Sequence, residues 1–256
     1  MNAPLLHDVH GPADAAVVVL STSIGTLPEM WDPQLDALAE RFRVVRVAHR
    51  GHDAVDVPPG PYDLADLAGD VLALLDSLGV QRFSWCGLSL GGMIGMWIAA
   101  HEPQRIEQLA LCCTSAYLPP AQGWLGRAAL VRTSGMVAVA DAVVERWFTP
   151  EFAVTSPEVV ARCRAMLLSV PPEGYAGCCE AIANMDLRTE ISRITAPTLV
   201  LAGADDLATP VKHAQAIVSL VPGARLVELP GLAHLATVQD PSSTTRLLLE
   251  HLGGQR

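Results

Sequence analysis

Phe83–Gly92 reads Phe-Ser-Trp-Cys-Gly-Leu-Ser-Leu-Gly-Gly, and this stretch decides the fold of the 256-residue chain. A short apolar run typical of a buried strand meets Gly-x-Ser-x-Gly, and an apolar run typical of a helix follows. That order predicts a sharp strand-to-helix turn, which holds its serine in a strained backbone conformation and exposes the hydroxyl. Gly87 and Gly91 stand where a Cβ would crowd the turn. Ser89 is therefore the candidate nucleophile, and the N–H of Leu90, unpaired at the start of the helix, is a candidate oxyanion donor. The alternative is a glycine-rich turn with a bystander serine.

The chain on both sides of this turn alternates strand patterns with helix patterns. A continuous apolar run at Ala15–Leu20 is typical of a strand buried on both faces, and further strands are predicted at Arg43–Ala48, Gln108–Cys113, Thr198–Ala202 and Arg225–Leu229. Amphipathic patterns predict helices that begin near Asp32 and Tyr62, and a final helix over Pro241–His251. This alternation is typical of an α/β protein with a doubly wound, mostly parallel sheet.

The alternation breaks directly after the strand near Gln108–Cys113. From Leu118-Pro119-Pro120 to about Arg188 the strand patterns vanish, and prolines separate segments with helical spacing of apolar residues. We expect this segment to be a helical insertion above the edge at which the strands end. The predicted organisation is a core made of residues 1–117 and 189–256 and a helical cap made of residues 118–188.

Charge and cysteine content limit the partners and the compartment. A net charge of −10 argues against nucleic acid or an anionic membrane as a partner. No apolar run is long enough to cross a membrane, and Met1–Pro4 lacks the features of a signal peptide. The six cysteines include no Cys-x-x-Cys pair, so zinc or thioredoxin-like chemistry has no support. Two vicinal pairs within apolar runs predict reduced, buried thiols in a cytoplasmic protein. The sequence signals neither a metal nor a cofactor.

A nucleophilic serine needs a base, and the base needs an acid that orients it. His234 lies in a loop of small residues after the last predicted strand and is the candidate base. Asp205 and Asp206 follow the strand before it, and we favour Asp206 as the orienting acid. The order Ser, Asp, His along the chain is that of the α/β hydrolases. His49 and His52, after an early strand, are interpreted as residues that structure their loop.

The second oxyanion donor is expected in the loop after the first predicted strand. Ser23 and Ile24 are the candidates, each through its backbone N–H. The hydroxyls of Ser21, Thr22 and Ser23 are alternative substrate contacts, and an ordinary polar turn is the remaining interpretation.

Taken together, these motifs resemble the α/β-hydrolase superfamily and, within it, the 3-oxoadipate enol-lactonases. The resemblance covers nearly the whole chain from about Gly11. It is carried in the core by Ser23–Thr26, Met30–Gln34, Cys86–Gly92, Gly203–Pro210 and Ala233–Leu235, and in the cap by Glu145–Pro150 and Pro172–Cys179. The cap stretches are the more telling, because triad motifs are shared by many unrelated activities.

The resemblance implies an α/β-hydrolase fold and cofactor-free hydrolysis of a five-membered enol-lactone in the bacterial β-ketoadipate pathway of aromatic catabolism. Such a small-molecule substrate carries a free carboxylate arm, which needs a cation in the pocket. Arg127, Arg132 and Arg146 in the cap are the candidates, each with a solvated helix-face charge as its alternative. Trp124 and Trp147 are candidate pocket walls, with core packing as their alternative. The sequence does not indicate an oligomeric state.

Three departures from the family pattern bear on the substrate. Asp53-Ala54-Val55 follows Arg50-Gly51-His52 where the family carries Gly-x-Ser, and Ser21-Thr22 stands where the family more often has an asparagine. The first strand of the usual leading hairpin is expected to be reduced or missing. A general carboxylesterase and a cofactor-free perhydrolase of the same fold are therefore alternatives. A ligand receptor on a hydrolase scaffold is a third alternative, against which the complete Ser-Asp-His set argues.

Overall fold

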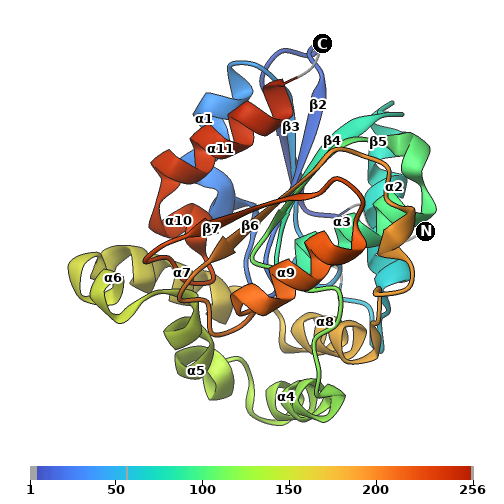
Figure 1. Ribbon diagram of the computed structural model, residues 1–256. Coiled ribbons are helices and arrows are strands. Elements are labelled where there is room, and N and C mark those ends of the chain that lie inside the picture. Colours follow the sequence, from blue (N-terminus) through green and yellow to red (C-terminus); the bar gives the residue numbers. More distant parts are fainter. Residues whose placement is uncertain (1–4, 56, 255–256) are drawn as a thin grey trace.

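The computed structural model describes residues 5–55 and 57–254; Met1–Pro4, where the sequence lacks signal-peptide features, lie outside the described residues. A seven-stranded sheet forms the centre of the molecule, in the spatial order β1-β3-β2-β4-β5-β6-β7 (Figure 1). All neighbouring strands are parallel except β1 and β3, so the predicted doubly wound, mostly parallel sheet is confirmed. The strands are β1 (His7–His10), β2 (Val17–Ser21), β3 (Arg43–Val47), β4 (Phe83–Leu88), β5 (Ile106–Cys112), β6 (Thr198–Gly203) and β7 (Arg225–Leu229).

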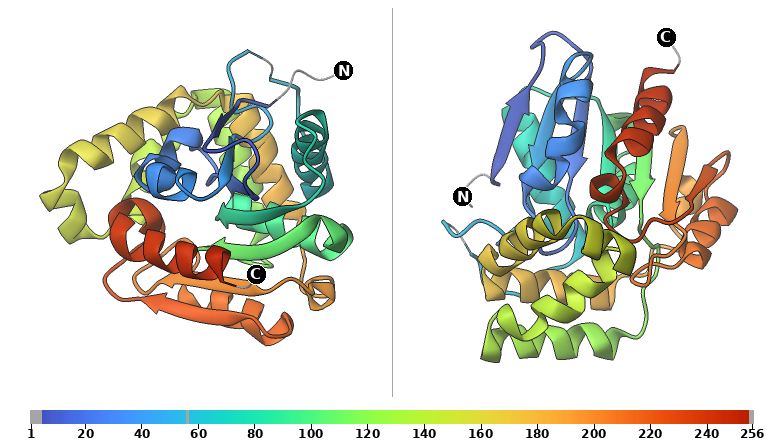
Figure 2. Two further views of the ribbon diagram at one scale, coloured as in Figure 1. Left: turned by 90° about the horizontal axis from the view of Figure 1, so that it is seen from above. Right: turned by 90° about the vertical axis from the view of Figure 1, so that its left-hand side faces the viewer.

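Helices cover both faces of this sheet (Figures 1 and 2). One face carries α1 (Asp32–Ala39), α10 (Ala236–Gln239) and α11 (Pro241–Gly253), and the other carries α2 (Leu64–Ser77), α3 (Leu90–His101) and α9 (Val211–Leu220). Short 3-10 turns lie at η1 (Pro28–Trp31), η2 (Pro103–Arg105) and η3 (Ile191–Arg193). Because both faces are covered, every residue of β4 and β6 is buried.

The ends of α2 show how the sequence sets a helix. The Asp63 side chain accepts a hydrogen bond from the Asp66 amide, and the Asp66 side chain accepts one from the Asp63 amide, which forms a capping box. Gly79 follows the helix with a φ of 72°, a left-handed conformation that favours glycine. A glycine thus caps the carboxyl end of the helix.

Strand β1 was not predicted from the sequence. It pairs antiparallel with β3 at the edge of the sheet, with His7 opposite Val47 and His10 opposite Val44. Its sequence, His-Asp-Val-His, contains a single apolar residue and none of its residues is fully buried, so no hydrophobic pattern marks it. The chain thus keeps a first strand, reduced to four residues.

The segment between β5 and β6 is helical, as its proline-separated apolar pattern predicts. Its helices are α4 (Ala121–Ser134), α5 (Val137–Trp147), α6 (Pro150–Thr155), α7 (Pro157–Ser169) and α8 (Pro172–Asn184). Figure 1 and the right-hand view of Figure 2 show these five helices together beyond one end of the sheet. The division of the chain into a core of residues 1–117 and 189–256 and a cap of residues 118–188 stays a prediction.

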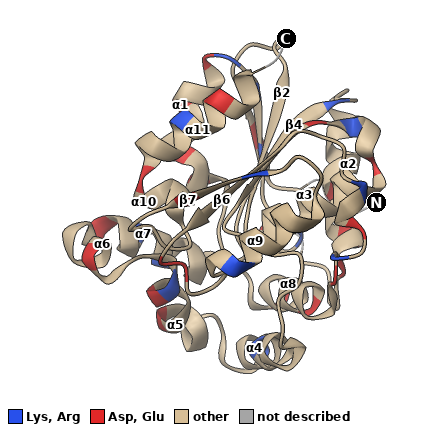
Figure 3. Ribbon diagram, viewed as in Figure 1, with Lys and Arg blue, Asp and Glu red and all other residues tan. Residues whose placement is uncertain are grey.

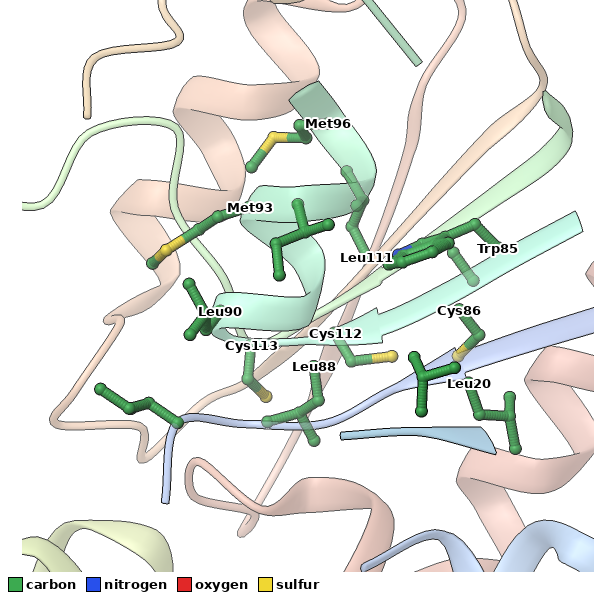
Figure 4. Packing of buried hydrophobic residues seen from close by; sticks show 14 of the residues in the cluster. Leu20, Trp85, Cys86, Leu88, Leu90, Met93, Met96, Leu111, Cys112 and Cys113 are labelled. Atoms are coloured by element: carbon green, nitrogen blue, oxygen red, sulfur yellow. The ribbon is translucent and has the colours of Figure 1, made fainter. Parts of the chain in front are cut away.

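Apolar packing fixes the turn between β4 and α3 (Figure 4). Leu88, Leu90 and Met93 are fully buried, and the Trp85 indole N–H donates to the Gly91 carbonyl at 3.0 Å. The six cysteines are all buried and unpaired. Charged residues of both signs are scattered over the core and the helical insertion (Figure 3). Among residues 5–55 and 57–254, no helix has the length and apolar character needed to cross a bilayer.

Candidate active site

Ser89 occupies the sharp turn that the sequence predicts. Its φ of 56° and ψ of −113° are rare for a residue with a side chain, so the expected backbone strain is present. A Cβ on Gly87 would overlap the Gly91 backbone, and a Cβ on Gly91 would lie 2.5 Å from the Ser21 carbonyl oxygen. Both glycines are therefore required by the close approach of backbone at this turn.

His234 and Asp206 form a buried hydrogen-bonded pair. His234 Nδ1 lies 2.8 Å from Asp206 Oδ2, and the two residues are 3% and 2% exposed. Because a carboxylate only accepts, Nδ1 carries the proton and Nε2 is left as the basic nitrogen of the ring. Asp205, the other candidate acid, is exposed. The structure thus brings Asp206 rather than Asp205 to the histidine.

Thr209, which sequence reasoning missed, completes this pair. Its hydroxyl donates to Asp206 Oδ2 at 2.7 Å, and its amide donates to Oδ1 at 2.9 Å. Burial acts against the charge on Asp206, but the electrostatic attraction of the His234 ring and the hydrogen bonds from His234 and Thr209 outweigh it. The pKa of Asp206 therefore lies below its ordinary value. The carboxylate stays ionised at neutral pH, as an orienting acid must.

One pocket, of about 50 Å³, contains both Ser89 and His234. It lies between the carboxyl ends of the strands and the helices of residues 121–184. Most of the predicted site residues line it, namely Ser23, Ile24, Ser89, Trp124, Arg127, Trp147 and His234. Arg146, a further candidate cation, also lines it, together with Leu118, Val143, Tyr175, Ala208 and Thr209.

Arg132 does not line this pocket, which corrects its prediction as a substrate-binding residue. Its guanidinium is held by two carboxylates, Glu173 at 2.8 Å and Glu180 at 2.5 Å. Both partners lie on α8, so the arginine links α4 to α8 and has no free charge to offer a ligand. The position of Arg132 on a helix could not distinguish it from Arg127, because only the packing of α4 against α8 decides which face meets the pocket.

The departure at Asp53–Val55 also lies outside the pocket. Val55 is 85% exposed, and its amide donates to the Asp53 side chain at 3.0 Å in a surface turn. By contrast, the Ser23 hydroxyl is buried, lines the pocket and has no hydrogen-bond partner among the described residues.

The backbone amides at the turn divide into paired and unpaired groups. The Ser89 amide donates to the Cys112 carbonyl at 2.9 Å, and the Gly91 amide donates to the Thr22 carbonyl at 3.0 Å. Within the described chain the Leu90 amide between them has no acceptor, as expected for the first residue of α3.

The loop after β2 shows the same division. The Ser23 carbonyl accepts from the Thr26 amide and from the Thr26 hydroxyl, at 3.1 and 2.8 Å. In a planar trans peptide the C=O and the following N–H point in opposite directions, so the Ile24 N–H points away from this turn. Neither the Ser23 nor the Ile24 amide donates to an acceptor in the part of the chain that the structure describes.

Two guanidinium groups line the side of the pocket formed by α4 and α5. Arg127 stacks on the Trp124 ring, with its Cζ 4.6 Å from the ring centroid. Arg146 is partly buried, and this burial, followed by the nearby charge of Arg127, lowers its pKa. Within residues 5–55 and 57–254, neither arginine forms an ion pair with a carboxylate. Because no ion pair in the described part of the chain engages these two cations, this wall is attractive to an anion.

A sequence model of the α/β-hydrolase fold matches residues 16–241. The chain therefore belongs to the α/β-hydrolase family, and it is an enzyme, a hydrolase.

Among the hydrolases that the chain resembles are two enol-lactonases and a protein named for carbamate hydrolysis. The chain is 39% identical to 3-oxoadipate enol-lactonase 2 of Acinetobacter baylyi over 94% of its own length and 90% of that protein. The crystal structure of the enol-lactonase from Burkholderia xenovorans LB400 is similar with a TM-score of 0.95 and 40% identity, over 97% of this chain and 96% of the other. RutD of Stutzerimonas stutzeri, whose name proposes a carbamate hydrolase activity, is 31% identical over 97% of each chain.

Proposed function

We propose that the protein hydrolyses 3-oxoadipate enol-lactone to 3-oxoadipate, with Ser89 as nucleophile, His234 as base and Asp206 as orienting acid. The observation that carries this proposal is the pocket itself, in which Ser89 and His234 share a small volume with two guanidinium groups that form no ion pair with a carboxylate of the described residues. Such a site suits an ester that also carries a free carboxylate. The similarity to two named enol-lactonases, at 39% and 40% identity, supports the choice of lactone.

In the proposed mechanism His234 Nε2 takes the proton as Ser89 Oγ attacks the lactone carbonyl. The amides of Leu90 and Ile24 stabilise the resulting oxyanion, each contributing about 3 kcal/mol. The peptide geometry favours Ile24 over Ser23, because the Ser23 carbonyl is fixed by Thr26.

Collapse of the tetrahedral intermediate breaks the ring C–O bond. The leaving enolate takes the proton back from His234 Nε2, which leaves the ring neutral, and it ends as the ketone of 3-oxoadipate while the acyl group stays on Ser89. Neutral His234 then removes a proton from water as the water oxygen attacks the acyl carbon. The bond from that carbon to Ser89 Oγ breaks, Oγ takes the proton from His234, and the product leaves as a carboxylic acid. No cofactor takes part in these steps.

We further propose that Arg127 and Arg146 hold the carboxylate arm, with Trp124 and Trp147 as walls. These side chains come from α4 and α5, whereas Ser89 and His234 come from the core. Residues 118–188 would therefore act as a cap that supplies the substrate-binding side of the site. Six buried, unpaired thiols suit a reducing compartment, and we propose a cytoplasmic location.

The decisive measurement follows the loss of the ultraviolet absorbance of the enol-lactone, with p-nitrophenyl acetate assayed in parallel. Ser89→Ala should lower the turnover of both at least about 10³-fold. Arg127→Ala should raise KM for the anionic lactone about 10-fold or more and leave the neutral ester nearly unchanged, because only the lactone carries the carboxylate. Arg132→Ala removes an arginine from the same helix but outside the pocket, and it should match the wild type. Turnover of the ester without turnover of the lactone would disprove the proposed lactonase activity.

A carbamate hydrolase is the second candidate, because a relative 31% identical over 97% of each chain bears that name. The same site could attack a carbamate carbonyl, and the two activities differ in the leaving group. Rapid release of ammonia from a small unsubstituted carbamate, together with slow lactone loss, would favour this second function.

A further inference from the structure

Two histidines that lie outside the pocket lining hold the loop that carries Ile24. His49 and His52 follow β3 and are 3% and 2% exposed. His49 Nε2 lies 2.9 Å from the Thr22 carbonyl oxygen, and the Gly25 N–H donates to His52 Nε2 at 3.0 Å. Their rings meet edge to face, with centroids 5.2 Å apart. The two ends of the loop are thus fastened to one buried pair of imidazoles.

These partners define the protonation of each ring. An amide N–H only donates, so His52 Nε2 carries no proton and the proton is on Nδ1, which faces the Arg50 carbonyl at 3.4 Å. A carbonyl only accepts, so His49 Nε2 carries the proton. Burial lowers the pKa of His52 to about 3 and that of His49 to about 4, which keeps both rings neutral.

The Gly25 amide is one of the two anchors that orient the Ile24 peptide. On one side of Ile24 the Ser23 carbonyl is fixed by Thr26, and on the other side the Gly25 N–H is fixed by His52. Without the imidazole acceptor, a buried amide would be left unpaired, which is unfavourable, and the turn would rotate to regain a partner. Such a rotation would turn the Ile24 N–H away from the oxyanion, and a misplacement of about 1 Å can lower the rate about 10²-fold.

We propose that His52 is a positioning residue for the oxyanion hole, acting as a neutral hydrogen-bond acceptor that fixes the Gly25 amide and thereby aims the N–H of Ile24. The proposal rests on the proposed function in that Ser89 is the nucleophile and the Ile24 N–H is an oxyanion donor. It does not depend on which ester or lactone is cleaved. His52 touches no substrate, since it does not line the pocket that holds Ser89.

The test compares His52→Leu, which removes the acceptor, with His52→Gln, whose Oε1 can accept at the position of Nε2. The probe is p-nitrophenyl acetate, and the rate of phosphylation of Ser89 by diethyl p-nitrophenyl phosphate is a second readout. We expect His52→Leu to lower kcat and the phosphylation rate 10- to 100-fold with KM changed less than twofold, and His52→Gln to recover most of the loss. Equal losses in both folded variants, or none in His52→Leu, would overturn the proposal.

A measurement on the unaltered protein covers the case in which His52→Leu does not fold. The nitrogen chemical shifts of ¹⁵N-labelled histidine distinguish the two tautomers. His52 should show a proton on Nδ1, and a proton on Nε2 would refute the acceptor role directly. Ser89→Ala separates this proposal from the proposed function, because ester turnover that survives Ser89→Ala would remove the nucleophile whatever the state of His52.

Discussion

At the scale of single residues, the Asp206 carboxylate is held in place by hydrogen bonds to both of its oxygens. Its two oxygens accept from the amides of Ala208 and Thr209, from the Thr209 hydroxyl and from His234. Asp206→Asn would present an amide to His234 and favour the wrong tautomer of its ring, so kcat should fall about 10²- to 10⁴-fold. Asp205→Asn is the matched control in the same loop and should stay within about twofold, because the Asp205 side chain is exposed. Steady-state hydrolysis of p-nitrophenyl acetate measures both variants. A larger loss of kcat in Asp205→Asn than in Asp206→Asn would make Asp205 the orienting acid.

The same residues show what the sequence could and could not supply at this scale. Chain order and loop position were enough to select Ser89 and His234, because nucleophile elbows and histidine loops have local patterns. Asp205 and Asp206 differ only in the direction of their side chains, which the turn after β6 decides. Thr209 carried no signal, since a threonine three residues after an aspartate is an ordinary turn residue.

At the scale of elements, the close contact between α8 and the loop after β3 positions the helical insertion. A Cβ on Gly174 would overlap the Gly51 backbone, which cannot yield as a flexible side chain could. Gly174→Ala should therefore lower the free energy of unfolding by about 1–3 kcal/mol. It should also raise KM for the lactone, because α8 carries the pocket residue Tyr175.

Gly126→Ala in α4 is the control for this prediction. A Cβ there would meet nothing within 4 Å, and alanine favours a helix over glycine by about 0.5–1 kcal/mol. Urea unfolding with a parallel KM measurement tests the pair. If Gly174→Ala proves as stable as Gly126→Ala, the contact with Gly51 does not hold α8.

Elements were predictable where their apolar pattern is dense. The buried strands β2, β4 and β6 are continuous apolar runs and were placed within one or two residues of their observed bounds. The edge strand β1 and helix α9 were missed. The first has one apolar residue, and the second is a short run, Val211–Leu220, between the predicted acid loop and a strand. The strand is set by its pairing with β3, which a local pattern does not contain. Helix α9, by contrast, has apolar residues at helical spacing, Ala214 and Ile217 among them, and was overlooked because it is short.

At the scale of the whole molecule, the buried neutral histidines make stability depend on pH. The pKa of His52 is lowered to about 3 and that of His49 to about 4 by burial, whereas an unfolded histidine titrates near 6.5. At a pH between the folded and the unfolded pKa, each ring is protonated in the unfolded chain but neutral in the folded protein. The free energy of unfolding therefore falls as the pH falls below about 6.5. Each ring contributes a slope of about 1.4 kcal/mol per pH unit, which ends near its folded pKa.

His52→Gln removes one titrating ring and keeps an acceptor for Gly25, which makes it the variant that isolates this effect. Urea unfolding of the wild type and of His52→Gln between pH 7.5 and 4.5 should give curves that run parallel above about pH 6.5. Below that pH the variant should lose stability less steeply, by about 1.4 kcal/mol per unit. The cause is global, because the ring is kept neutral by the core that surrounds it, and unfolding the whole domain exposes it. Identical slopes would mean that His52 takes up its proton without unfolding, and the loop that carries Ile24 would then have to open in the native state.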